Sequence, residues 1–445
     1  MNLVMPNILQ AENLASDRVL NGVVNDHYAG HESNLVRRWL PVAEWFDDRC
    51  DLGLDPYQKY SRGKISATVS GVFRNGVAFS GVNFASQDYL SLSSHLRLVR
   101  SVKSAAEDFG VHSAGSSSLM GGCEMSLRLE QAFEKFLEYR EVTLFPTGWT
   151  AGYGIVKMLA RPGDHIVIDF LAHACLQEGA SCSGATVHRF PHLSNEAVRK
   201  HLVRIRSAQP DAGILVVTET LFSMDSDSPA VAELQAICTE HGATLLVDCA
   251  HDLGCMGETG RGILEVQGMV GKVDVLMGSF SKTFASIGGF VATQHRGLRT
   301  AMRACCGPQT FTNAMTPIQA AVVLEALAIV SDPEGAVRRK RLAANVAYLR
   351  QQLHENGFVT TGEPSAIVPV AVGDSATARL MTRHMTRNGA IVNLVEYPAV
   401  ARSKSFWRLQ VMADHEGSQI NDLVCKAIEA RAAICNQPTV EECSP

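Results

Sequence analysis

The sequence predicts an α/β protein with a large domain on a mainly parallel sheet and a smaller α+β domain near the C-terminus. Three observations lead to this prediction. Short runs of β-type residues alternate with helical stretches between about residues 140 and 280. The 445 residues are too many for one simple core. At 332–335, Asp-Pro-Glu-Gly separates a long apolar helix from a basic helical run.

The expected strands of the large domain are short and apolar, which is typical of strands buried on both faces. They are Val142–Phe145, His165–Ile168, Ala185–Arg189, Gly213–Thr218, Thr244–Val247 and Val273–Met277. Helices are expected between them at Trp149–Leu159, Ala172–Ser181, Asn195–Ser207 and Ala230–His241. This alternation predicts a parallel sheet with helices on both faces.

The flanking regions complete the expected organisation. Apolar residues recur at helical spacing over 35–46, 125–138 and 317–330, and strands are expected at Ile367–Val372, Ala390–Val392 and Trp407–Val411. We therefore expect an N-terminal extension over 1–50 and a segment over 51–100 that contributes to the small domain. The large domain should span 101–335, and the small domain 336–445, with a mobile tail from Asn436.

Composition argues against several classes of protein. The formal charge of −5 is unlike that of a nucleic-acid or membrane-surface binder. The longest apolar stretch, about 318–330, is interrupted by Gln319 and Glu325 and is too short to cross a bilayer. The N-terminus lacks the pattern of a signal peptide, and the 12 cysteines show no CxxC spacing. We expect a cytoplasmic protein with reduced thiols and no metal site.

Two expected strands end on residues that can carry chemistry. Lys282 follows one strand in Gly-Ser-Phe-Ser-Lys-Thr-Phe, and Asp248 ends another, with His251 three residues later. A lysine in a crowded pocket can act as a Schiff-base nucleophile, and a buried carboxylate needs a cationic partner. Taken singly, each has an ordinary interpretation: a solvated lysine, or an aspartate that caps a helix or binds a metal.

Two further features join this pattern. The segment 145–152, Phe-Pro-Thr-Gly-Trp-Thr-Ala-Gly, runs from a strand through a glycine turn into a helix, which is a typical phosphate cradle. His173 stands at a predicted helix start, where it could stack on a planar cofactor or only cap the helix. In their order along the chain these features predict a pyridoxal phosphate (PLP) site at the carboxyl ends of the strands, with Lys282 as the anchoring lysine.

The chain resembles the α-oxoamine synthases of PLP-dependent fold type I from about Asn83 to Ala430. The family includes serine palmitoyltransferase, 8-amino-7-oxononanoate synthase, 5-aminolevulinate synthase and 2-amino-3-ketobutyrate CoA ligase. The segments that carry the resemblance start at Asn83 (NFASQDYLSL), Leu171 (LAHACL), Glu219 (ETLFSMDSD), Val247 (VDCAHDLG), Gly257 (GETGRG) and Ser279 (SFSKTF). The resemblance implies a large domain with a sheet of the seven-stranded type and a smaller C-terminal domain.

It also implies roles for particular residues around the cofactor. Lys282 would bind PLP as a Schiff base and then move protons at the substrate Cα. Asp248 would keep the pyridine nitrogen protonated, His251 would reach the ring hydroxyl, and His173 would stack on the ring. Glu219 is expected to border the cofactor.

The phosphate and the substrate are assigned in the same way. Gly148 and Trp149 would offer backbone amides to the phosphate, Ser279 a hydroxyl, and Thr312 would reach it from the other subunit of a homodimer. Ser223 would lie near the substrate carboxylate. The bidentate clamp on that carboxylate is expected from Arg408.

The chain departs from the family pattern on the side of the acyl donor. Ser117 and Ser126 stand near positions that usually hold an arginine and a histidine in the glycine-rich segment. Phe406 replaces a frequent second arginine, and Gly152 a turn asparagine. These changes leave two acyl donors open, an acyl-CoA or an acyl carrier protein.

The resemblance implies a C-acyltransferase that condenses glycine, alanine or serine with an acyl thioester and releases CO2, which gives an α-amino ketone. One alternative is another fold type I activity, such as that of an aminotransferase, aldolase or decarboxylase. Another is a catalytically silent homologue, which the presence of Lys282 disfavours.

Overall fold

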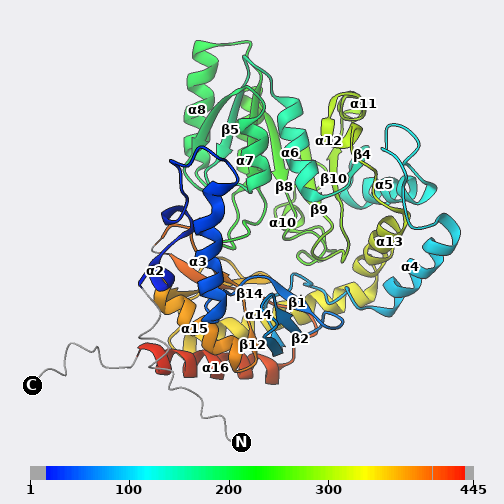
Figure 1. Cartoon of the computed structure of the whole chain (residues 1–445). Coiled ribbons are helices and arrows are strands. Elements are labelled where there is room, and N and C mark those ends of the chain that lie inside the picture. The colour runs from blue at the N-terminus through cyan, green and yellow to red at the C-terminus, as the bar shows by residue number, and fades with distance from the viewer. Residues whose placement is uncertain (1–16, 403, 436–445) are drawn as a thin grey trace, which may run out of the picture.

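The computed structural model describes residues 17–402 and 404–435, and the predicted tail from Asn436 lies outside them. Its centre is a seven-stranded sheet in the order β4-β10-β9-β8-β7-β5-β6 (Figure 1). The strands β5 to β9 pair in parallel, and β10 is antiparallel to both of its neighbours. The predicted mainly parallel α/β fold is confirmed.

The six expected strands of the large domain form within two residues of their expected bounds. They are β4 (Glu141–Phe145), β5 (His165–Asp169), β6 (Thr186–Phe190), β7 (Ile214–Glu219), β8 (Thr244–Asp248) and β9 (Val275–Ser279). The seventh, β10 (Gly289–Thr293), was not predicted. Its five residues follow the loop that carries Lys282, so this short apolar run was not recognised as a separate strand.

The helices that cover the sheet also form where expected. They are α6 (Gly148–Leu159), α7 (Ala174–Ser181), α8 (Asn195–Ala208) and α9 (Val231–Glu240), joined by α4 (Leu96–Phe109), α5 (Glu124–Leu137), α10 (Ile263–Val266), α11 (Arg296–Cys305), α12 (Gly307–Thr310) and α13 (Pro317–Ser331). One apolar cluster lies on each face of the sheet, because alternate side chains of a strand point to opposite faces. In β7, Val216 joins one cluster, and Leu215 and Val217 join the other.

The small domain holds two sheets. Strands β11 (Ile367–Gly373), β14 (Ser405–Gln410) and β13 (Leu394–Val395) form one. The other contains β1 (Lys59–Ser61), β2 (Thr68–Phe73), β3 (Ala78–Asn83) and β12 (Ala390–Ile391). Helices α14 (Pro333–Glu355), α15 (Ser375–Arg387) and α16 (Gly417–Cys435) complete the domain (Figure 1). Because β12 pairs with β3, residues 59–83 are built into the C-terminal domain.

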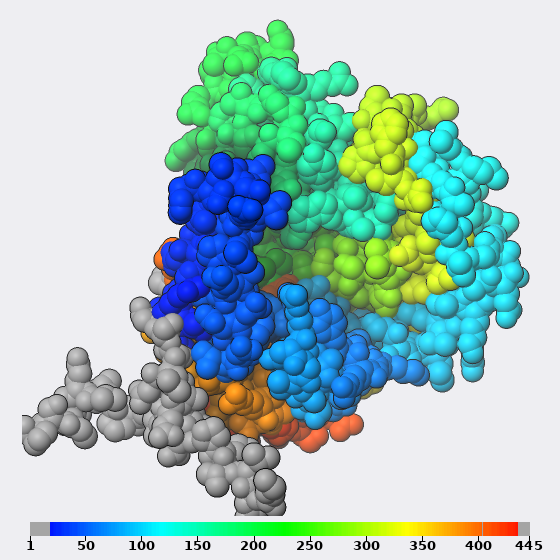
Figure 2. Space-filling model, viewed as in Figure 1, coloured from blue at the N-terminus to red at the C-terminus, as the bar shows by residue number. Residues whose placement is uncertain are grey.

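The N-terminal segment is anchored by a buried ionic cluster. It contains α2 (Asp17–Asn21), the 3-10 turns Val24–Asp26 and Arg37–Trp39, and α3 (Leu40–Asp51). Glu396 accepts hydrogen bonds from Arg49 of α3 at 2.7 Å and from Arg379 of α15 at 2.8 Å. All three side chains are at most 3% exposed. Figure 2 shows this segment in dark blue over the visible face of the molecule.

No helix in the described part of the chain is long and apolar enough to cross a membrane.

Candidate active site

One pocket of about 280 Å³ lies at the carboxyl edge of the large sheet. Eight of the predicted site residues line it: Gly148, Trp149, His173, Glu219, Asp248, His251, Ser279 and Lys282. They come together because Glu219, Asp248 and Ser279 are the last residues of the adjacent strands β7, β8 and β9. The carboxyl ends of parallel strands meet at one edge, where α/β sheets bind ligands.

The start of α6 forms an anion cradle. Thr147 caps the helix by accepting a hydrogen bond from the Thr150 amide at 3.1 Å. The preceding helix amides have no acceptor within the helix, so they are available to an anion. A side chain at Gly148 would come within 2.5 Å of the Ser279 hydroxyl, and only a glycine leaves this space open.

Lys282 is half-buried, and the charges of Asp248, Glu219 and Arg408 act on its ammonium group. Burial lowers the pKa of its ammonium, the charge of Asp248 raises it, and the charge of Arg408 lowers it again. Burial raises the pKa of Asp248, which Lys282 opposes, and burial raises the pKa of Glu219 well above its usual value. Glu219 and Asp248 are register partners in adjacent strands, and the charge of Asp248 also raises the pKa of Glu219.

Two hydrogen bonds hold His173 in place, one through its backbone amide and one through its ring. Its amide donates to Glu219 at 2.6 Å, and its ring Nδ1 accepts from the Cys175 amide at 3.3 Å. The Cys175 sulfur lies 3.0 Å from the same nitrogen. Nδ1 therefore carries no proton in the neutral ring, and Nε2 does. Burial lowers the pKa of His173, which favours this neutral form.

The tautomer of His251 is set by a residue that the sequence analysis did not assign. The Tyr89 hydroxyl lies 2.9 Å from His251 Nδ1, and both side chains are buried. Burial raises the pKa of Tyr89 and lowers that of His251 well below its usual value, so the phenol donates to a neutral ring. Tyr89 lies in the segment quoted from Asn83, but 162 residues separate the partners, and no spacing signal joins them.

The three other predicted residues do not line this pocket. Arg408 of β14 is close enough for its charge to lower the pKa of Lys282 and His251, and its buried Nε and Nη2 have no hydrogen-bond partner among the described residues. Ser223 is half-buried, after β7. Thr312 donates a hydrogen bond to the Pro308 carbonyl after α12.

These features fit PLP and an amino acid. The helix start and Ser279 suit a phosphate, Asp248 suits a protonated pyridine nitrogen, and Lys282 can form a Schiff base with an aldehyde. The unpaired nitrogens of Arg408 suit a carboxylate, because a buried donor without a partner carries a free-energy cost. No group of three or more metal-ligating side chains occurs among the described residues.

Comparison with known proteins identifies a matching family and related sequences. The family model for class I and II aminotransferases matches residues 80–428. The 8-amino-7-oxononanoate synthase of Marinomonas sp. is 32% identical over 78% of this chain and 84% of its own. The enzyme of the same name from Citrobacter koseri is 34% identical over 77% of this chain and 88% of its own.

The chain belongs to the α-oxoamine synthases, within the class I and II aminotransferase family. A serine palmitoyltransferase variant from S. paucimobilis, solved with a bound PLP–myriocin aldimine, is similar to this α-oxoamine synthase. Its TM-score is 0.84, with 29% identity over 91% of this chain and all of the other. The family and the fold type I architecture predicted from the sequence are therefore confirmed.

Proposed function

We propose that this α-oxoamine synthase condenses a small amino acid with an acyl thioester and releases CO2 to give an α-amino ketone. The observation that carries the proposal is one pocket that gathers Lys282, Asp248, His251 and an anion cradle, with Arg408 close by, whose Nε and Nη2 have no partner among the described residues. The names of the relatives support it, since both kinds are synthases or transferases of this family.

The cofactor would be PLP, which supplies an electron sink for the Cα of an amino acid bound to it. Lys282 would hold the cofactor and then carry the Cα proton, and the lowering of its pKa by burial favours the neutral amine that this role needs. Asp248 stabilises positive charge at the pyridine nitrogen. His251 would donate from Nε2 to the hydroxyl of the cofactor ring, because Tyr89 occupies Nδ1.

The amino acid is oriented by its carboxylate. Arg408 offers two buried N–H groups, Nε and Nη2, and can hold both carboxylate oxygens at once. Ser223 is proposed on the same side of the substrate. Neutral His173 would stack on the cofactor and could donate from Nε2 to a substrate oxygen, because Nδ1 is already an acceptor. Glycine, alanine and serine all suit this clamp.

A covalent trapping experiment tests the cofactor assignment. The chain loaded with PLP is reduced with borohydride, digested and analysed by mass spectrometry, and the adduct is expected on the peptide with Lys282. Lys282→Ala should remove both the adduct and turnover. An adduct on another lysine would overturn the assignment.

Product analysis tests the reaction class. CO2 and free thiol should be released together when an amino acid and an acyl thioester are supplied. Transfer of the amino group without CO2 would favour an aminotransferase, and CO2 without thiol a decarboxylase. Turnover with acyl-CoA alone, as fast as with an acyl carrier protein, would exclude a requirement for the carrier.

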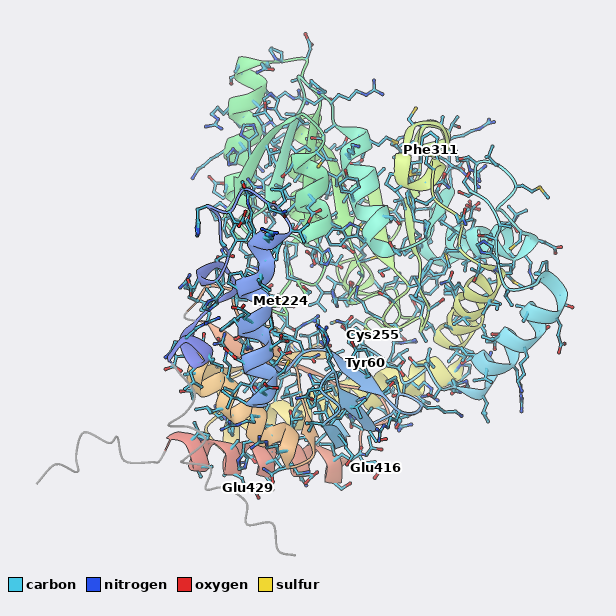
Figure 3. All side chains as sticks on the ribbon, viewed as in Figure 1. Tyr60, Met224, Cys255, Phe311, Glu416 and Glu429 are labelled. Carbon is cyan, nitrogen blue, oxygen red and sulfur yellow. The ribbon has the colours of Figure 1, made fainter. Side chains whose placement is uncertain are left out.

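We also propose a homodimer in which Thr312 contributes to the partner's phosphate site. Leu119, Met120 and Phe311 are 85%, 88% and 87% exposed, which is unusual for large apolar side chains. Figure 3 labels Phe311 beside α12. The two loops that carry these residues are held together, since Gln309 donates to the Ser117 hydroxyl at 2.6 Å.

A cytoplasmic location is proposed as well, supported by ten free cysteines among the described residues.

A further inference from the structure

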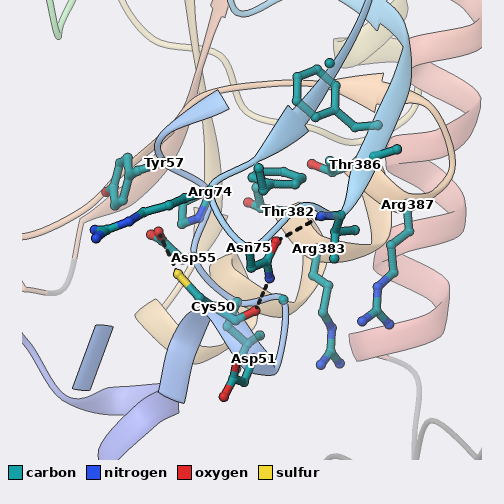
Figure 4. Close-up of a pocket in the computed structure, with 18 of the residues that line it drawn as sticks. Cys50, Asp51, Asp55, Tyr57, Arg74, Asn75, Thr382, Arg383, Thr386 and Arg387 are labelled. Carbon is teal, nitrogen blue, oxygen red and sulfur yellow. Dashed lines mark hydrogen bonds between the residues drawn. The ribbon is translucent and has the colours of Figure 1, made fainter. Parts of the chain in front are cut away.

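A second cavity lies in the small domain and has no role in the reaction proposed above. Its volume is about 520 Å³, and it shares no lining residue with the pocket around Lys282. Its walls come from the end of α3 and the loop that follows, from β2, β3 and their turn, and from α15 (Figure 4). The volume is within the range of sites that bind small metabolites.

The lining carries a strong excess of positive charge. Five arginines face two aspartates, Asp51 and Asp55, although the whole chain has a net charge of −5. The arginines are Arg62, Arg74, Arg379, Arg383 and Arg387. Such a concentration of guanidinium groups around a cavity favours an anion.

The arginines differ in how they are neutralised. Arg379 is paired with the buried Glu396. Arg62, Arg74 and Arg387 form no ion pair with any residue in the described ranges. Arg383 and Arg387 lie four residues apart on α15, and Figure 4 shows their side chains extending in the same direction. Arg383 also donates to the Leu52 carbonyl at 3.3 Å, whereas the Arg387 side chain is exposed and accessible to an anion.

The cavity also offers a hydrogen-bond acceptor without a partner. Asp55 accepts from the Cys50 thiol through Oδ2 at 3.5 Å, but its buried Oδ1 has no partner among the described residues. Asn75 is already engaged, because its amide donates to the Cys50 carbonyl at 3.0 Å. A buried acceptor left unpaired is costly, so Oδ1 suits a ligand that brings a hydroxyl or amino donor.

One wall of the cavity is apolar. Phe73 and Phe79 contribute rings whose centroids are 5.2 Å apart, and Val77 and Ala78 adjoin them. A ligand that fills this space therefore has a carbon skeleton. Inorganic phosphate alone would leave the wall and Asp55 without contacts.

We propose that this cavity binds a small organic phosphate that also carries a hydroxyl or amino donor. The phosphate group is bound by Arg387 with Arg383, the donor group is received by Asp55, and the skeleton lies against Phe73 and Phe79. Guanidinium groups suit this ligand because their planar N–H pairs match phosphate oxygens.

Calorimetric titration of the full chain loaded with PLP tests the proposal, because the cofactor then fills the phosphate cradle at Gly148. The probes are ribose 5-phosphate, ADP and inorganic phosphate at low ionic strength. One equivalent of ribose 5-phosphate or ADP should bind, more tightly than inorganic phosphate. The double variant Arg74→Gln/Arg387→Gln should weaken binding roughly tenfold or more, and Asp55→Ala should weaken it several-fold.

A matched control separates a built site from a general effect of charge. Arg140→Gln/Arg296→Gln removes two exposed arginines outside the cavity and should leave the affinity unchanged. Absence of binding by both organic probes would overturn the proposal. Equal weakening by the two double variants would also overturn it, because binding would then follow net charge rather than the cavity.

Discussion

At Lys282, burial and charge act in opposite directions on one ammonium group. Burial and Arg408 favour its neutral form, whereas Asp248 and Glu219 favour its charged form. A lysine that must both form a Schiff base and carry a proton needs a pKa between these extremes. The balance depends on the charges of Asp248, Arg408 and Glu219, which act on the ammonium group.

Tyr89→Phe should remove the preference of His251 for one tautomer. The wild-type ring accepts at Nδ1, so its proton should reside on Nε2, and the variant should show a mixture of both tautomers. Nitrogen-15 spectra of the ring in the cofactor-free chain measure this directly. Tyr139→Phe is the matched control, since Tyr139 donates in the core to the Val273 carbonyl at 3.1 Å. An unchanged His251 spectrum in Tyr89→Phe would contradict the assignment.

Arg408→Lys should impair binding of the amino acid more than the chemical step. Lysine keeps the positive charge but cannot form the bidentate pair that Nε and Nη2 of Arg408 allow. We expect KM for the amino acid to rise about tenfold or more, with a smaller change in kcat. Steady-state kinetics, with KM for the acyl thioester as the internal control, check this. An equal rise of both KM values would argue against a carboxylate clamp.

At the scale of elements, the register of the sheet decides the site. Glu219 of β7 is the register partner of Asp248 of β8, and Asp248 is the partner of Met277, two residues before Ser279 in β9. The site thus spans three strands, of which β7 and β8 end level with each other and β9 continues for two more residues. A separate contact, made by His192, connects the segment after β6 with β5 and with the loop after β7.

His192 should make folding stability dependent on pH in the alkaline range. Although burial opposes it, the carboxylates of Asp169 at 2.9 Å and Asp227 at 3.1 Å raise the pKa of His192 to about 10. A raised pKa gives stability that is fully present below the unfolded value of 6.5 and is lost as pH rises through about 10. His192→Gln should therefore show a smaller loss of unfolding free energy across this range.

Urea unfolding at pH values spread from about 6 to about 10 measures this difference. His31→Gln is the control, because His31 is exposed and makes no side-chain hydrogen bond with the described residues. If His192→Gln and the wild type lost stability in parallel, the charged form of His192 would not stabilise the fold.

At the scale of the whole molecule, the N-terminal segment and the C-terminal part of the chain pack together beside the large domain. Glu396 joins Arg49 of the N-terminal segment to Arg379 of α15, and β3 pairs with β12, so residues from both ends of the sequence form the small domain. The large domain leaves exposed apolar loops at Leu119, Met120 and Phe311. We attribute their exposure to the proposed homodimer.

Met120→Asp/Phe311→Asp should convert a dimer into a monomer. Two charges placed in an apolar interface are costly to bury, so association should weaken strongly. Size-exclusion chromatography with light scattering measures the mass, and activity should fall with it. Val203→Asp/Val266→Asp, at 48% and 69% exposed positions elsewhere, is the matched control. A wild-type monomer, or a variant that stays dimeric, would contradict the proposed interface.

The sequence by itself determined the strand and helix pattern of the large domain and the set of residues expected around PLP. The alternation of residues in a strand, a glycine turn and the residue at a strand end are local properties of the sequence. They identify positions such as Lys282, Asp248 and Gly148 without knowledge of the tertiary structure. The tertiary structure decided what depends on distant contacts: the antiparallel β10, the Tyr89–His251 pair and the arginine cavity at Arg387. These features depend on free energies of pairing and burial between residues far apart in the chain, and no spacing along the sequence records them.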